Sequence, residues 1–289
     1  MPTDLGESTD EDGAHFKSPL GADVDDIDLR IQAFETALVE QKHQNELIIK
    51  RIDDLLWMQA LEDVSTVSKI KYTGPARFEE NDTAQAAGTE LTVYGYVFIQ
   101  KHIDKKVKPP LLVFMHGGVH SNLKGTEYMA VVRELMDPRY VIVAPDYRGG
   151  TGYGSDYYNQ LDYGGADIDD VYRSGELVLD RYDFIDSSRV GILGWSQGGG
   201  LTLWNISNYP DAYQAAYAGV PVSNLALRAG TKAQGSRGYL ADDYGAPSGI
   251  GKPAYDNVKE YVKRSPVYNA ENLCGPQPAF LALLSGPPI

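Results

Sequence analysis

The first strong pattern along the chain is a helical repeat between about Asp23 and Asp63, a stretch without proline or glycine. Apolar side chains recur there at alternating intervals of four and three residues, at Ile27, Ile31, Phe34, Leu38, Ile48, Ile52 and Leu55. Gln41 and Asn45 occupy the two intervening positions. Such a stripe is typical of a coiled-coil seam, which predicts a homodimer through residues 23–63, or of an amphipathic helix docked on its own domain. The sequence leaves both interpretations open.

From Leu91 onward, short apolar runs alternate with helical stretches. The runs are Val93–Gln100, Leu111–Met115, Tyr140–Ala144, Val190–Trp195, Ala215–Val220 and Ala279–Leu284. The helical stretches between them include Glu127–Met136, Asp167–Arg181 and Gly199–Asn208. Buried strands alternating with helices predict a mostly parallel sheet with helices on both faces. The expected fold class is therefore α/β, preceded by a long N-terminal helix.

The charge of the chain is strongly acidic, with 40 acidic and 26 basic side chains and a net charge of −14. A broad basic surface for nucleic acid is therefore not expected. Nine acidic residues and one lysine fall within residues 1–28. A charge run of this kind is usually solvated, so we expect residues 1–22 to form an acidic disordered tail.

Composition excludes several other classes of protein. No apolar run approaches the roughly 18 residues that a membrane helix needs, and no signal peptide is visible, so we expect a cytoplasmic protein without membrane contact. The single cysteine, Cys274, excludes an internal disulfide and a cysteine-based zinc cluster. Gly149–Gly154 lacks the spacing of a dinucleotide-binding loop, and no set of residues has the spacing of metal ligands. We therefore expect neither cofactor nor metal.

The motif with the clearest chemistry is Gly194-Trp-Ser196-Gln-Gly198, which lies between an apolar run and a helical stretch. A G-x-S-x-G sequence in that context is typical of a nucleophile elbow, a tight turn that lifts the serine hydroxyl above the sheet. The alternative without a catalytic role is a glycine-rich turn with a serine that caps the helix. The strand before the motif and the helix after it favour Ser196 as a catalytic nucleophile.

A second motif, His116-Gly-Gly118, follows the predicted strand Leu111–Met115. Acyl transfer develops an oxyanion that needs fixed N–H donors, and a glycine-rich loop at a strand end can supply one. We expect Gly118 N–H to form the oxyanion hole together with the N–H of Gln197, the residue after the nucleophile. His116 is not expected to be the general base, because the base follows the nucleophile in this architecture.

Four motifs in order resemble the catalytic domain of the prolyl oligopeptidase family: His116–His120, Asp146–Gly154, Asp167–Asp170 and Gly194–Gly199. The resemblance covers about Leu91 to Leu284 and is closest to acylaminoacyl-peptidase-like and esterase-like members. It implies an α/β-hydrolase fold and hydrolysis of peptide or ester bonds by Ser196. It also implies that Tyr147 and Arg148 lie at the rim of the substrate site.

The family's catalytic triad runs Ser, Asp, His, with the base after the nucleophile. The five histidines of this chain are His15, His43, His102, His116 and His120, and all of them precede Ser196. The sequence reaches Ile289 soon after the last predicted strand. We therefore expect a hydrolase domain truncated before the catalytic Asp and His, with weak or no turnover.

The expected organisation is an acidic tail over residues 1–22, an N-terminal helical segment over 23–70 and an incomplete α/β-hydrolase catalytic domain over 71–289. The leading functional hypothesis is a serine hydrolase that cleaves short peptides or acyl esters through an acyl-enzyme on Ser196. The alternative is a catalytically impaired hydrolase fragment that acts through helix-mediated association.

Overall fold

The computed structural model describes residues 24–76, 91–136, 140–231, 250, 254–274 and 280–284. The chain divides into two compact units, Met1–His43 and Gln44–Ile289. The first helix, α1, spans Val24–Ala60, as the long helical repeat predicted. Within the described residues, no helix is long and apolar enough to cross a membrane. The predicted acidic tail, residues 1–22, lies outside the described residues.

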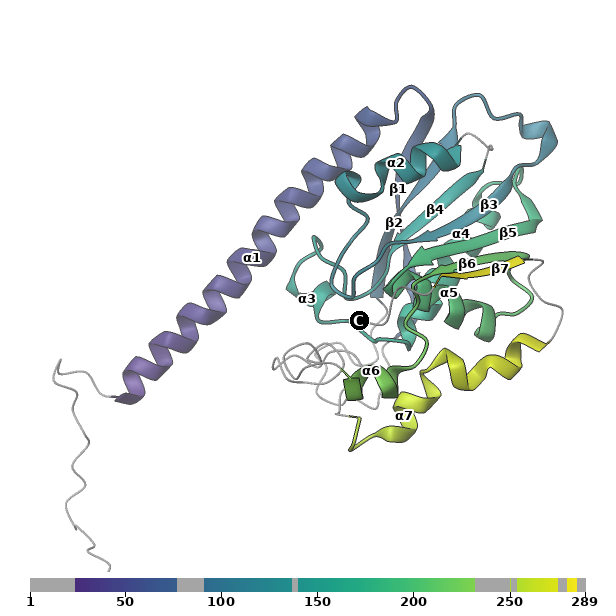
Figure 1. The fold of residues 1–289 in the computed structure, drawn as a ribbon. Coiled ribbons are helices and arrows are strands. Elements are labelled where there is room, and N and C mark those ends of the chain that lie inside the picture. Colours follow the sequence, from purple (N-terminus) through teal and green to yellow (C-terminus); the bar gives the residue numbers. More distant parts are fainter. Residues whose placement is uncertain are drawn as a thin grey trace, which may run out of the picture. The chain divides into compact units, whose positions relative to one another are not determined.

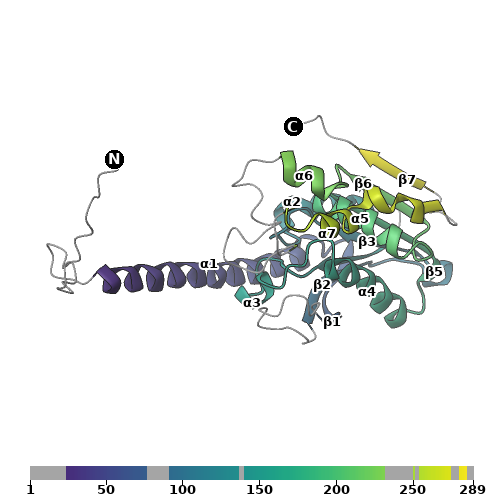
Figure 2. The same cartoon turned by 90° about the horizontal axis from the view of Figure 1, so that it is seen from below.

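Seven strands of the described chain form one sheet in the order β1-β2-β4-β3-β5-β6-β7. They are β1 (Ser65–Gly74), β2 (Leu91–Gln100), β3 (Pro110–Met115), β4 (Val141–Asp146), β5 (Asp186–Trp195), β6 (Ala215–Gly219) and β7 (Phe280–Leu284). β2 runs antiparallel to both of its neighbours, β1 and β4, and all other neighbouring pairs are parallel. β1 and β7 therefore lie at opposite ends of the sheet (Figure 2).

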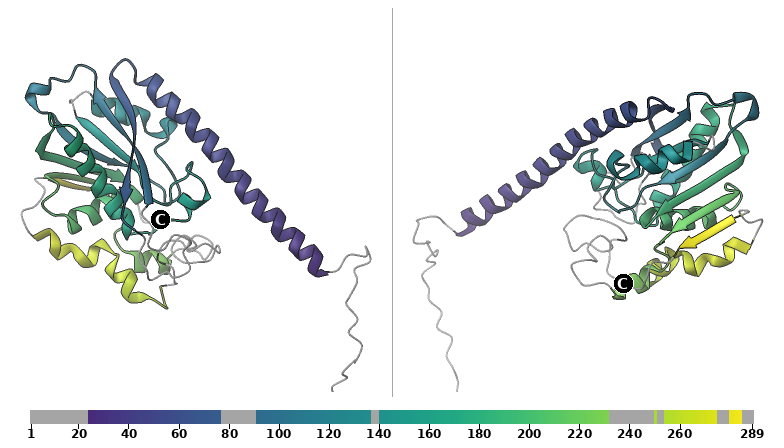
Figure 3. Two further views of the ribbon diagram at one scale, coloured as in Figure 1. Left: turned by 180° about the vertical axis from the view of Figure 1, so that it is seen from behind. Right: turned by 45° about the horizontal axis from the view of Figure 1, so that its top comes forward.

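Helices cover both faces of the sheet (Figures 1 and 3). α2 (Gly125–Met136) packs on one face together with Trp57 from the end of α1. α4 (Ala166–Arg181) and α5 (Gln197–Asn208) pack on the other face. The shorter elements are α3 (Ser155–Tyr158), α6 (Leu225–Thr231), α7 (Val258–Lys263) and 3-10 turns at Lys105–Val107 and Pro266–Cys274. The predicted α/β class, with a mostly parallel sheet between helices, is confirmed.

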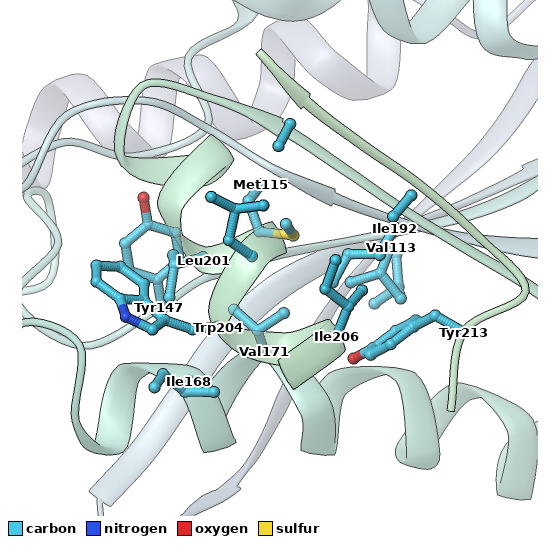
Figure 4. Packing of buried hydrophobic residues seen from close by; sticks show 14 of the residues in the cluster. Val113, Met115, Tyr147, Ile168, Val171, Ile192, Leu201, Trp204, Ile206 and Tyr213 are labelled. Atoms are coloured by element: carbon cyan, nitrogen blue, oxygen red, sulfur yellow. The ribbon is translucent and has the colours of Figure 1, made fainter. Parts of the chain in front are cut away.

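The alternation of side chains along β3 divides the core into two layers. Val113 and Met115 belong to the cluster formed with α4 and α5, in which Leu201 lies close by (Figure 4). Leu112 and Phe114 belong to the cluster on the opposite face. Complete burial of each such side chain contributes about 1.5–3 kcal/mol to folding. β3 is therefore anchored on both faces, and the loop that follows it starts from a rigid position.

The predicted helical segment, residues 23–70, extends too far. α1 ends at Ala60, and β1 starts at Ser65 and pairs with β2 along its whole length. β1 lies at the edge of the sheet, where exposed polar residues such as Lys69 alternate with buried ones such as Ile70. A strand with so few apolar side chains carries little sequence signal. Residues 65–70 therefore belong to the sheet.

The part of α1 that lies in the second unit presents two different faces. Lys50, Asp53 and Trp57 are buried, at 2%, 8% and 0% exposure. Ile48, Ile52 and Leu55 of the apolar stripe are 57%, 54% and 67% exposed. The helix therefore docks through a face that the apolar repeat did not indicate, and over residues 44–60 the stripe is not the docking face.

Candidate active site

Ser196 occupies the turn between β5 and α5. Its backbone has φ 56° and ψ −112°, a conformation that residues other than glycine rarely adopt. Its N–H donates to the carbonyl oxygen of Gly219 on β6 at 2.9 Å, and its own carbonyl accepts the N–H of Gly200 at 3.0 Å. Ser196 is exposed, whereas Gln197 and Gly198 beside it are buried. This is the strand–turn–helix geometry of a nucleophile elbow.

The glycines on either side of Ser196 are required by close backbone contacts. A Cβ atom on Gly194 would lie 2.5 Å from the carbonyl carbon and oxygen of Gly198. A Cβ atom on Gly198 would lie 2.6 Å from the carbonyl oxygens of Met115 and His116. These distances are too short for any side chain, so a larger residue would displace the elbow from the end of β3. The G-x-S-x-G spacing thus has a steric cause in this chain.

The loop after β3 lies directly beside the elbow. A Cβ atom on Gly117 would lie 3.2 Å from the carbonyl oxygen of Trp195 and 3.6 Å from Cβ of Ser196. Gly118 follows with φ 85°, in the left-handed region that favours glycine. Gln197 begins α5, and the first N–H groups of a helix have no acceptor within it. The structure therefore gathers the proposed nucleophile and the two segments assigned to the oxyanion hole.

Two histidines, His116 and His120, lie in this loop. His116 is fully buried, and burial lowers its pKa although the Asp146 carboxylate lies 3.7 Å from Nε2. The ring is therefore neutral at pH 7. His120 places Nδ1 2.7 Å from the carbonyl oxygen of Gly149 and stacks on Tyr158.

Tyr147 and Arg148 do not lie at the rim of the site, because both are fully buried. The Tyr147 hydroxyl donates to the carbonyl oxygen of His116 at 2.9 Å. Arg148 forms a bidentate ion pair with Asp170 of α4, with Nε–Oδ2 at 2.7 Å and Nη2–Oδ1 at 2.8 Å. These contacts hold both side chains inside the protein. Tyr147 and Arg148 therefore support the end of β4 from inside the protein.

The sequence assigned a role only to the backbone N–H of Gln197, but the side chain of Gln197 also has a hydrogen-bond partner. Gln197 is buried, and its Nε2 donates to Oδ2 of Asp167 at 3.4 Å. Burial, followed by the nearby carboxylate of Asp162, raises the pKa of Asp167 to about 8. The sequence predicted a helical stretch from Asp167 to Arg181. Nothing in that stretch showed which carboxyl group would be buried.

The raised pKa of Asp167 predicts a pH dependence of stability. Above about pH 4 the unfolded chain releases the proton of Asp167, whose pKa there is 3.8, whereas the folded protein retains it. The stability that Asp167 contributes is therefore fully present below about pH 4 and is lost as the pH rises toward 8. We expect Asp167→Asn to gain stability relative to the wild type from pH 5 to pH 8, by up to about 1.4 kcal/mol for each pH unit. Urea unfolding at four pH values measures this.

The matched control for Asp167 is Asp183→Asn, which changes an exposed carboxyl group. It should leave the difference from the wild type constant across the same pH range. Parallel curves for Asp167→Asn and the wild type would show that Asp167 is already ionised in the folded protein.

Comparison with known proteins identifies the fold and the family. The model of the prolyl oligopeptidase family matches residues 126–286, which is more than half of the chain. The chain belongs to the prolyl oligopeptidase family. It is 34% identical over 159 residues to dipeptidyl peptidase 8 of Homo sapiens, and 36% identical over 128 residues to the acylamino-acid-releasing enzyme of Rattus norvegicus. The family resemblance that the sequence motifs indicated is therefore confirmed.

These alignments cover 53% and 44% of this prolyl oligopeptidase-family chain, but only 17% of each relative. Among solved structures, a puromycin-hydrolysing peptidase of Mycobacterium tuberculosis matches with a TM-score of 0.61 and 25% identity, over 77% of this chain and 31% of that one. An acylaminoacyl peptidase of Pyrococcus horikoshii matches with a TM-score of 0.55 over 78% of this chain and 33% of its own, at 22% identity, which shows the shared fold. The chain thus spans about a sixth of the length of dipeptidyl peptidase 8 and of the acylamino-acid-releasing enzyme.

Proposed function

We propose that this chain carries the nucleophile of a serine hydrolase that cleaves short peptides or acyl esters through an acyl-enzyme on Ser196. The observation that supports it most is the backbone of Ser196, held at φ 56° with an exposed side chain between β5 and α5. Strained backbone of this kind costs about 1–3 kcal/mol and is found mainly at functional sites. The substrate class also agrees with the relatives, whose names describe the release of acylamino acids or dipeptides.

The proposed reaction has two steps. The Ser196 hydroxyl loses its proton to a base and forms a bond to the substrate carbonyl carbon, whose oxygen takes the negative charge. The N–H groups of Gly118 and Gln197 stabilise that oxyanion, and its collapse releases the amine or alcohol, which takes up a proton. Water then attacks the ester on Ser196, releases the acid and restores the hydroxyl.

The proton acceptor is not assigned within these 289 residues, because all five histidines precede Ser196. In the family order, the histidine follows the serine. Attack of the Ser196 hydroxyl on a reagent with a very good leaving group depends least on such a base. That step is therefore the one that tests Ser196 in this chain.

The test is covalent labelling of the folded chain with a fluorophosphonate, followed by intact mass and peptide mapping. We expect one adduct, on Ser196, that disappears when the protein is unfolded before labelling. An N-acetyl dipeptide anilide and an acetyl ester are then added as competitors, and slower labelling identifies the class that binds. An adduct on any other residue, or equal labelling of the unfolded chain, would contradict the proposal.

Association through α1 is a second candidate function, and the exposed stripe formed by Ile48, Ile52 and Leu55 favours it. With these residues at the seam, Asn45 falls at a core position, where a polar residue fixes the register of a two-stranded coiled coil at some expense of stability. A second copy of this chain is the partner that matches such a repeat. This function does not require turnover.

We expect the double change Ile31→Asp and Leu38→Asp to convert a dimer into a monomer, because it places four like charges in the seam of the pair. Sedimentation equilibrium measures the mass. The control is Ala33→Asp with Thr36→Asp, which adds the same charges to exposed positions on the opposite side of the helix. A wild-type chain that sediments as a monomer at micromolar concentration would exclude helix-mediated association.

A further inference from the structure

The loop after β3, defined as residues 116–125 so that it includes Gly125 at the start of α2, carries the proposed oxyanion donor Gly118. The buried face of α1 contacts the second half of this loop through three polar groups. Lys50 Nζ lies 3.2 Å from both Oδ1 of Asn122 and the carbonyl oxygen of Leu123. These bonds join a side chain near the end of α1 to the backbone of the loop.

Two more side chains of α1 continue the contact, each about one helical turn further along. Oδ1 of Asp53 accepts the N–H of Gly125 at 2.7 Å. The indole Nε1 of Trp57 donates to the carbonyl oxygen of Leu123 at 3.2 Å. Lys50, Asp53 and Trp57 therefore bond to three groups in a short stretch of the loop, and all three are buried.

Asp146, at the end of β4, holds the same loop. Its Oδ1 accepts the N–H of Leu123 at 2.6 Å, and its Oδ2 accepts the hydroxyl of Tyr153 at 2.5 Å. Lys50 Nζ lies 2.9 Å from the same Oδ2, so the two side chains form a buried ion pair next to the loop. Burial opposes ionisation of Asp146, but the charge of Lys50 together with the hydrogen bonds from Tyr153 and the Leu123 N–H holds the pKa of Asp146 below its usual value.

A buried ion pair is a poor source of stability, because removing two charges from water costs about as much as their attraction returns. The lysine and the carboxylate are instead well placed to define one conformation of the segment between them. Leu123 is bonded at both its N–H and its carbonyl, and Gly118 lies five residues before it in the same loop. A shift of the clamped segment would therefore change the direction of the Gly118 N–H.

We propose that Lys50 and Asp53 are positioning residues, which hold the loop 116–125 so that the Gly118 N–H faces the oxyanion formed at Ser196. The proposal rests on the function proposed above for Ser196. Neither residue touches the reacting atoms, so they act through the loop. Misplacement of a donor slows the step in which the oxyanion forms and leaves reagent binding almost unchanged.

The experiment measures fluorophosphonate labelling of Ser196 over a range of reagent concentrations, which separates the limiting rate from the binding constant. We expect Lys50→Met and Asp53→Ala to lower the limiting rate by about 10–100-fold, with the binding constant changed less than about threefold. Asp53→Asn retains an acceptor for the Gly125 N–H and should recover most of the rate. Arg133→Met is the control, since Arg133 ties α2 to the carbonyl of Ala60 and to Asp63 without contacting the loop.

Hydrogen exchange of residues 117–125 is measured on the same variants. Lys50→Met and Asp53→Ala should accelerate exchange there, and Arg133→Met should not. Unchanged exchange and an unchanged limiting rate in a folded Asp53→Ala protein would overturn the positioning role. If the wild type is not labelled at Ser196, the proposed function fails, and exchange still decides whether α1 holds the loop.

Discussion

Ser196→Ala is expected to abolish covalent labelling, with a fall in labelling rate of at least about 10³-fold. The expectation follows from the geometry of the elbow, where Ser196 is exposed at the start of α5 and the two residues after it are buried. Alanine removes the attacking oxygen but keeps the side-chain volume close to that of serine. The fold should therefore survive, and thermal unfolding of the variant should match the wild type within a few degrees.

Ser207→Ala is the matched control, because Ser207 is a buried serine near the other end of α5. It lies about 16 Å along the helix axis from Ser196, and its hydroxyl donates to the carbonyl of Leu203 at 2.8 Å. We expect its labelling rate to equal that of the wild type. Residual labelling of Ser196→Ala at more than a few per cent would mean that another nucleophile reacts, and the assignment of Ser196 would be wrong.

Arg148→Met is expected to destabilise the protein by about 3–5 kcal/mol, because it leaves the buried carboxylate of Asp170 without its partner. Both side chains of the pair are 0% exposed, and Arg148 Nη2 also donates to the carbonyl oxygen of Pro75 at 2.9 Å. For a domain of this size, the corresponding fall in Tm is about 6–20 °C. Differential scanning calorimetry measures it directly.

Arg189→Met provides the comparison, since Arg189 forms an ion pair with Asp186 at 2.6 Å in which the arginine side chain is 51% exposed. Solvent screens that pair, so its loss should cost far less stability than the loss of Arg148. Adding Asp170→Asn to Arg148→Met removes the unpaired charge. It keeps an acceptor for the backbone N–H of residue 148, so it should recover part of the stability. Equal effects of Arg148→Met and Arg189→Met would show that burial of the Arg148–Asp170 pair does not raise the cost of losing it.

The sequence predicted those features that depend on local order along the chain. The alternation of apolar runs and helical stretches predicted the six strands from β2 to β7 and the helices α2, α4 and α5. The glycines around Ser196 predicted the elbow, because the short backbone contacts at Gly194 and Gly198 admit no side chain. Both kinds of signal lie within a few residues of the structure that they specify, so no knowledge of the rest of the fold is needed to read them.

The tertiary structure alone decided which polar residues are buried and what they contact. Lys50, in a helix whose apolar stripe is exposed, bonds to Asp146 and to the loop after β3. Arg148 pairs with Asp170 inside the protein, although the family resemblance implied a position at the rim of the site. A charged residue is buried only where a partner of opposite charge meets it, and that meeting depends on the order of the strands in the sheet. Because the partners lie far apart in the chain, no local pattern could indicate them.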